Sequence, residues 1–145
     1  MTQSLAKRPI SWAPDFTIDR NGVVWNGHVR VPTTGLLSQR GVKQLAVNID
    51  GEPVVVWRLL ATIWYEGRMI LPRDGNAMNY HADNTIDLKS VSSLKISDPD
   101  EILKIWVKYC EGICCWQLAE KTGIHLYSRD EFYGLIKDIL IAGIR

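Results

Sequence analysis

The sequence contains only three cysteines, and they lie close together in its last third. Cys110, Cys114 and Cys115 are odd in number, and no histidine follows them at a zinc-finger spacing, since His125 stands alone about ten residues later. Such a pattern fits a reducing compartment rather than a disulfide-stapled secreted scaffold. We interpret the three as buried thiols and not as metal ligands.

Long hydrophobic runs are also missing. No apolar run approaches the roughly 20 residues that a helix needs to cross a bilayer. Residues 1–10 include two basic side chains but no apolar core of the kind that a signal peptide requires. These absences predict a cytoplasmic protein with no membrane partner.

An excess of charge of one sign is the third absence. The formal net charge is +1, and residues 1–98 hold 11 Lys and Arg against 9 Asp and Glu. Proteins that bind nucleic acid normally present a basic surface to the phosphates. A uniformly basic binding body is therefore excluded, and any DNA binding must use a local patch.

What the sequence does contain is a series of short β-rich runs separated by turn signals. The steps Asn21-Gly22 and Asn26-Gly27 flank the run Val23–Trp25, which predicts tight hairpins. Residues 45–49 and 54–56 predict two more strands. An antiparallel β meander is expected, preceded by a loose polar arm over residues 1–13.

A helix and a polar turn follow the meander. Apolar residues recur at helical spacing over Trp57–Tyr65, and Gly67 ends that helix. Met69–Leu71 predicts a short strand and Pro72–Asn84 a polar loop, because Asp, Gly and Asn favour turns. A second short helix or turn is expected to open at Ile86.

Three helices are predicted after residue 97, where the composition changes. Pro99 and the two acids after it suit a first helical turn, and Gly112 breaks that helix. Apolar spacing predicts further helices over Ile113–Lys121 and Asp130–Ile141.

The order of motifs resembles the homing-type HNH endonucleases of bacteriophage. The residues that carry the resemblance are Arg58-Leu59-Leu60-Ala61, Asp74-Gly75-Asn76 and Asn79, and it covers roughly residues 14–94. Trp57 stands where the family has a histidine. The resemblance implies a ββα nuclease motif, a double-stranded DNA partner and action in the cytoplasm of a bacterial host.

The chemical residues of that family are missing. HNH cleavage needs a neutral imidazole that takes a proton from water and a divalent cation held by oxygen or imidazole ligands. The resemblance places the base at Pro72 and the preceding ligand at Leu71, neither of which can serve. The third position falls on Asp87 once a few extra loop residues are allowed. We therefore expect no cleavage and no cofactor.

A rebuilt site is the alternative. His81 and Asp83 lie in the polar loop, with Asp74 and Asp87 on either side, and could form a metal site for Mg²⁺ or another divalent cation. If the protein is an active endonuclease, the catalytic candidates are His81, Asp74 and Asp87. The competing interpretation, which we favour, is that the histidine is a solvated loop residue and the acids form turns.

Basic residues along the chain are the candidates for phosphate contact if they share a face. They are Arg40, Lys43, Arg58, Arg73 and Lys89. Ordinary solubilising charge explains them equally well.

The C-terminal helices resemble a helix-turn-helix module, on the match of Leu118-Ala119-Glu120 and Gly123-Ile124. A DNA-reading helix needs polar and basic residues on its exposed face. The third helix offers Arg129 and Lys137 beside three acids. We favour a structural or partner-binding cap over DNA reading.

The sequence thus predicts an α+β protein in three parts: an arm over residues 1–13, a meander with a degenerate HNH-like ββα motif over residues 14–96, and a helix-turn-helix-like module over residues 97–145. The expected function is a phage-type binding or regulatory protein derived from an HNH endonuclease that has lost cleavage. It would act on DNA or on a host protein, without a small-molecule cofactor. The alternatives are an active metal-dependent endonuclease and a purely protein-binding inhibitor of a host enzyme.

Overall fold

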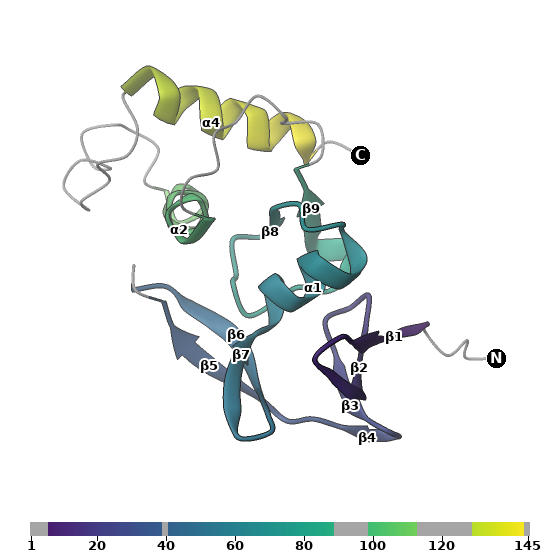
Figure 1. The fold of residues 1–145 in the computed structure, drawn as a ribbon. Helices are drawn as coiled ribbons and strands as arrows, with labels where there is room; N and C mark the ends of the chain where they lie inside the picture. Colours follow the sequence, from purple (N-terminus) through teal and green to yellow (C-terminus); the bar gives the residue numbers. More distant parts are fainter. Residues whose placement is uncertain (1–5, 39–40, 89–98, 113–128, 144–145) are drawn as a thin grey trace.

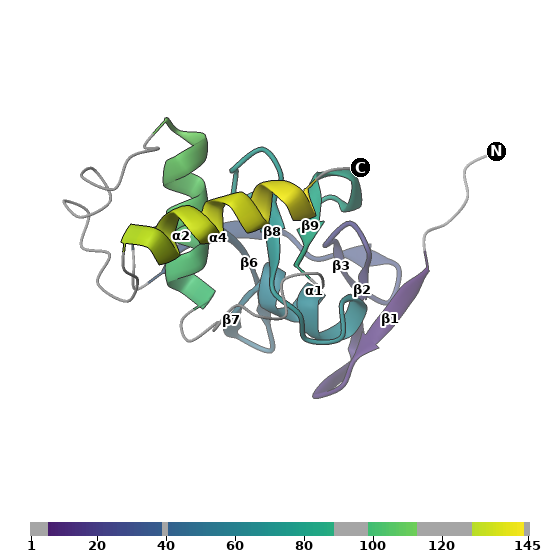
Figure 2. The same ribbon diagram turned by 90° about the horizontal axis from the view of Figure 1, so that it is seen from above.

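The computed structural model describes residues 6–38, 41–88, 99–112 and 129–143. Within these ranges the chain forms small antiparallel sheets and α-helices, so the α+β class is confirmed. Figure 1 shows the first two sheets below a central helix, with the remaining helices on the opposite side of the molecule, and Figure 2 shows these helices from above.

The first sheet has the strand order β1-β2-β3-β4. Its strands are β1 Lys7–Ile10, β2 Ala13–Asp19, β3 Val24–Asn26 and β4 Val29–Arg30. Both Asn-Gly hairpins are confirmed, because β3 pairs antiparallel with β2 and with β4. Gly22 takes a φ of +78°, which a glycine adopts without strain. The carboxylate of Asp19 accepts hydrogen bonds from the backbone N–H groups of Asn21 and Val23 and fixes the first turn.

The loose arm expected over residues 1–13 is wrong from Lys7 onward, where the chain forms β1. Ile10 is completely buried, and the guanidinium of Arg8 donates to the carbonyl of Ile63 at 2.9 Å. The strand was not evident from the sequence because most of its residues are polar. Part of its support also comes from a helix more than 50 positions later. Tertiary contacts decide such a segment where local propensity is weak.

The second sheet has the order β5-β6-β7 and leads directly into the first helix. The elements are β5 Thr33–Leu37, β6 Lys43–Ile49, β7 Glu52–Val55 and α1 Val56–Trp64. Trp57 donates from Nε1 to the buried amide oxygen of Gln44 at 2.9 Å, and Trp64 donates to the carbonyl of Ile18 at 3.0 Å. These two indoles therefore fasten α1 to both sheets.

The third sheet is a hairpin of β8 Ile70–Pro72 and β9 Thr85–Asp87. The prediction that a helix or turn opens at Ile86 is wrong, because Ile86 is buried and pairs with Leu71 across the hairpin. The loop between the strands contains one 3-10 turn, Ala82–Asn84. Residues 89–98, where the helix of a ββα unit would begin, lie outside the described part of the chain.

Two of the three predicted C-terminal helices are confirmed as α2 Pro99–Cys110 and α4 Arg129–Ala142. The helix predicted over residues 113–121 lies outside the described residues. Helix α4 packs against β9, and Figure 1 shows it above the β8–β9 hairpin. Among the described helices, none has the length and apolar character needed to span a membrane.

Candidate functional site

The loop that joins β8 to β9, residues 73–84, carries most of the side chains that the sequence marked as candidates. Asp74 accepts hydrogen bonds at 2.9 Å from the backbone N–H of Asn76 and from the side-chain amide of Asn84. Its own N–H donates back to the Asn84 amide oxygen at 3.1 Å. The carboxylate of Asp74 therefore accepts hydrogen bonds within the turn that it helps to form.

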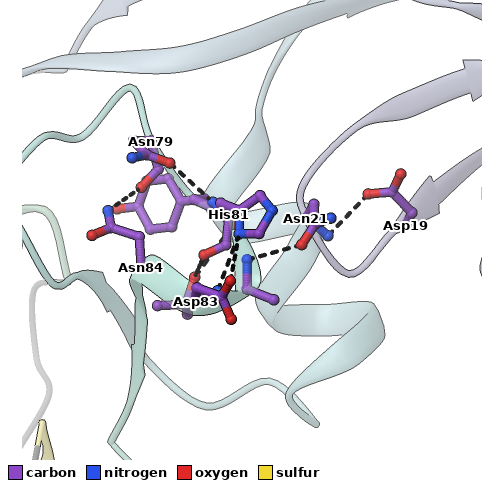
Figure 3. Close-up of polar contacts among 9 residues, drawn as sticks. Asp19, Asn21, Asn79, His81, Asp83 and Asn84 are labelled. Atoms are coloured by element: carbon purple, nitrogen blue, oxygen red, sulfur yellow. Dashed lines mark hydrogen bonds and ion pairs between the residues drawn. The ribbon is translucent and has the colours of Figure 1, made fainter. Parts of the chain in front are cut away.

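His81 is exposed and caps the 3-10 turn. Its Nδ1 accepts a hydrogen bond from the backbone N–H of Asp83 at 3.2 Å, and its own N–H donates to the side chain of Asn79 at 3.2 Å (Figure 3). Asn21 accepts from the N–H of Ala82 and ties this loop to the first sheet. The lone pair of Nδ1 is therefore engaged by the turn. In this geometry His81 is not placed as a general base.

Asp87 lies at the other end of the hairpin. Its Cα partner across the sheet is Ile70, whereas the loop leaves β8 after Pro72. Both carboxylate oxygens of Asp87 bind Arg68, at 3.0 Å to Nε and 2.8 Å to Nη2. The hydrogen bond and charge of Asp87 raise the pKa of Arg68 above its ordinary value. Both oxygens of this carboxylate are therefore engaged by a guanidinium, which leaves neither of them free to bind a metal ion.

The structure does not bring the three endonuclease candidates together as a metal site. Among the described residues there is no group of three or more His, Cys, Asp or Glu side chains that could hold a metal ion. Asp74 and His81 are occupied in the loop, and Asp87 is occupied at the opposite end of the hairpin. The rebuilt-site alternative therefore gains no geometric support.

The positions that the family resemblance gives to the base and its neighbouring ligand are inside the core. Leu71 is completely buried, and Pro72 is buried beside it in β8. The indole of Trp106 in α2 donates to the carbonyl of Pro72 at 2.6 Å. These positions pack a helix onto the hairpin and present no functional group to solvent.

The five basic candidates do not form one described surface. Lys43 is exposed on β6. Arg58 is half-exposed, lies 4.7 Å over the ring of Trp57 and pairs with Asp100 at 3.0 Å. The guanidinium of Arg73 donates to the carbonyl of Gly143 just after α4, where a cation is favoured by the helix dipole. The remaining two, Arg40 and Lys89, lie outside the described residues.

A different set of cations lies against aromatic rings near β1, and the sequence did not single it out. The ammonium group of Lys7 lies 4.0 Å over the ring of Trp25, and the guanidinium of Arg8 lies 3.9 Å over the ring of Trp64. Arg20 approaches the same Trp64 ring at 5.8 Å. We call Lys7, Arg8 and Arg20 the β1 rim. The sequence does show a basic pair, Lys7 and Arg8, and a separate Arg20. It does not show that Arg8 and Arg20 approach the same ring, because Trp64 lies more than 40 positions later in α1.

Cys110 corrects the interpretation of the cysteines as buried thiols, because it is exposed near the end of α2. Partial burial of its sulfur, with the carboxylates of Asp74 and Glu111 nearby, raises the pKa of this thiol to about 11. A neutral thiol is a poor nucleophile and a poor metal ligand. Cys114 and Cys115 lie outside the described residues.

Comparison with known proteins gives one limited likeness. No family model matches the chain, and no curated protein matches it. A solved structure described as "DNA binding and cleavage by the HNH homing endonuclease I-HmuI" is similar to it, with 19% sequence identity and a TM-score of 0.39. The similar region covers 70% of this chain and 67% of the other. At this TM-score the likeness carries no weight for fold or function.

Proposed function

We propose that this protein binds DNA through the β1 rim and does not cleave it. The observation that supports this proposal most directly is that Arg8 and Arg20 both approach the ring of Trp64, while Lys7, next to Arg8 in β1, lies over the ring of Trp25. A chain with a net charge of +1 thereby gains a local cationic surface of the kind that phosphate contact requires.

The rim is held in place before any ligand arrives. Stacking on Trp64 and a hydrogen bond to the Ile63 carbonyl fix Arg8, which otherwise has many rotamers. Ordering a long side chain in advance reduces the entropy lost on binding. Asp19, the acid nearest Arg20 in sequence, is buried, and its carboxylate is used by the turn and by the indole of Trp25.

Descent from an HNH endonuclease is part of the proposal. Its support is the run Arg58–Ala61 at the start of a helix, followed by a hairpin whose loop begins with Asp74-Gly75-Asn76. The loss of cleavage is supported by the buried Pro72 and by the hydrogen bonds that occupy His81 and Asp87. The role proposed on this basis is phage-type regulation through binding DNA without hydrolysing it.

Binding is tested by fluorescence anisotropy of a labelled DNA duplex over a series of salt concentrations. We expect affinity to fall as salt rises, and the double variant Arg8→Ala/Arg20→Ala to lower the slope of log K against log salt by about 2, since each phosphate contact contributes about 0.9. The matched control is Lys108→Ala/Lys137→Ala, which removes two cations from α2 and α4. Equal losses of DNA affinity in both double variants, or no DNA binding by the unaltered protein, would contradict binding through the β1 rim.

Cleavage is tested separately by incubating supercoiled plasmid with Mg²⁺ or Mn²⁺. We expect no nicking by the unaltered protein, because no described group is placed to activate water. Metal-dependent nicking that disappears in the His81→Ala variant would establish the endonuclease alternative instead.

A further inference from the structure

Trp12 is an exposed indole at the tip of the β1–β2 hairpin. Ser11 and Trp12 form the two-residue connection between the paired residues Ile10 and Ala13. Such connections favour Asn, Asp or Gly, which tolerate positive φ, yet neither residue here takes a positive φ. Trp12 is 56% exposed, so neither the core nor the turn requires an indole at this position. An exposed aromatic residue that neither the core nor the turn requires is a candidate for contact with a ligand.

A shallow hollow of about 210 Å³ opens beside this indole, between the hairpin tip and α1. Trp12 and Arg58 line it together with apolar residues that include Val54, Leu59 and Ile63. Pockets for drug-sized ligands measure about 300–1,000 Å³, so this hollow is too small for a complete cofactor. Its size and its apolar lining suit one planar ring.

One arginine lines this hollow and a second lies near it. Arg58 is the lining residue, and its side chain is 49% exposed even though one nitrogen pairs with Asp100. Arg8 does not line the hollow, but its guanidinium donates to the carbonyl of Ile63, which does. Each guanidinium is stacked on a tryptophan of α1, which fixes its position and leaves other N–H donors for a ligand.

We propose that this hollow receives a single unpaired base of a nucleic acid, stacked on Trp12, with a flanking phosphate bound by Arg58 or Arg8. The inference rests on the proposed function and narrows the partner to nucleic acid with an unpaired or extruded nucleotide. A nucleotide supplies both a π face for the indole and an anion for the guanidinium groups. An aromatic side chain of a protein partner would fill the hollow but would bring no phosphate to the exposed N–H donors of Arg58 that Asp100 leaves available.

The test uses the full chain and two fluorescent duplexes, one fully paired and one carrying a single bulged 2-aminopurine. The unaltered protein should bind the bulged duplex more tightly and quench its 2-aminopurine. Trp12→Ala should weaken binding to the bulged duplex by about 5- to 150-fold, the range found for removal of a stacking platform, and abolish the quenching. Trp12→Phe is the matched control, because it keeps a ring, and should retain most of the preference.

The outcomes separate this inference from the proposed function. If Trp12→Ala binds both duplexes as the unaltered protein does, while Arg8→Ala/Arg20→Ala still weakens both, the base site is wrong and DNA binding stands. If neither duplex binds, both proposals fail. If Trp12→Ala binds both duplexes as before but no longer binds a protein that the unaltered chain binds, the hollow is a protein-docking site and the inference is overturned. Circular dichroism of each variant verifies that the fold is retained.

Discussion

Arg68 and Asp87 form a two-pronged ion pair at the open end of the β8–β9 hairpin. Nε of Arg68 lies 3.0 Å from one carboxylate oxygen of Asp87, and Nη2 lies 2.8 Å from the other. Both oxygens of the residue that the family resemblance marked as a metal ligand are therefore engaged by one guanidinium. In this structure Asp87 stabilises the hairpin through Arg68 and is not available as a metal ligand.

The first prediction concerns this ion pair. Arg68→Ala should lower the melting temperature, because it removes two charge-assisted hydrogen bonds from a partly buried carboxylate. Arg30→Ala, which removes an exposed arginine from β4, is the control and should change it less. Differential scanning fluorimetry measures both. In the unaltered protein, millimolar Mg²⁺ should leave the melting temperature unchanged, and a clear increase would show that Asp87 binds metal after all.

The second prediction concerns the contact between the polar loop and α2. Gly75 takes a φ of +78°, and a Cβ built there would lie 2.4 Å from Cβ of Cys110. Gly75→Ala should cost the left-handed backbone strain of about 1–2 kcal/mol and a further overpacking term of about 1–3 kcal/mol. Gly51 has a similar φ of +84° with nothing within 4 Å, so Gly51→Ala should cost the strain alone. Urea unfolding of both variants gives the difference, and equal losses would mean that loop and helix do not touch.

The third prediction concerns the thiol of Cys110, studied in a Cys114→Ser/Cys115→Ser background. With its pKa raised to about 11, alkylation by iodoacetamide near pH 8 should be far slower than that of an ordinary thiol. Between about pH 9 and 11 the unfolded chain releases this proton while the folded chain keeps it, so stability should fall as pH rises through that window. Adding Cys110→Ser should remove that part of the pH dependence. Rapid alkylation at pH 8 would show that the sulfur is less buried than its contacts indicate.

The fourth prediction concerns Tyr80. Its side chain is 1% exposed, burial raises the pKa of its phenol, and within the described residues its hydroxyl has no hydrogen-bond partner. A buried hydroxyl without a partner costs about 1–3 kcal/mol, so Tyr80→Phe should leave the free energy of unfolding unchanged or increase it. Tyr80→Leu, which removes the ring, should reduce it by creating a cavity. A marked loss in Tyr80→Phe would reveal a partner for the hydroxyl.

Local sequence signals predicted the elements whose cause is local. The Asn21-Gly22 and Asn26-Gly27 hairpins, α1, α2 and α4 follow from turn chemistry and apolar periodicity, and the structure has them close to the expected bounds. Lys7–Ile10 was missed because its residues are mostly polar, although its hairpin partner β2 follows directly. Ile86 was misassigned because its strand character comes from pairing with β8.

The candidate site was harder to predict, because the partner of each side chain decides its role. Sequence alone could show that Pro72 is no base, but not that Arg68 holds Asp87 from 19 positions away. Arg73 looked like a phosphate contact and instead binds the end of a helix 70 positions later. The β1 rim required knowing that Arg8 and Arg20 share the ring of Trp64. Side-chain pairing over such separations is set by tertiary packing, and no local periodicity reports it.

The burial of Pro72 also limits which residues position 72 can accept. Its ring lies inside β8, and its carbonyl accepts a hydrogen bond from the indole of Trp106, so this position helps to hold α2 on the hairpin. A histidine placed there would enter a space shaped for a smaller apolar ring, with Leu71 beside it offering no ligand. Building a hydrolytic site at this position would therefore need several coordinated changes, and the first of them would cost stability.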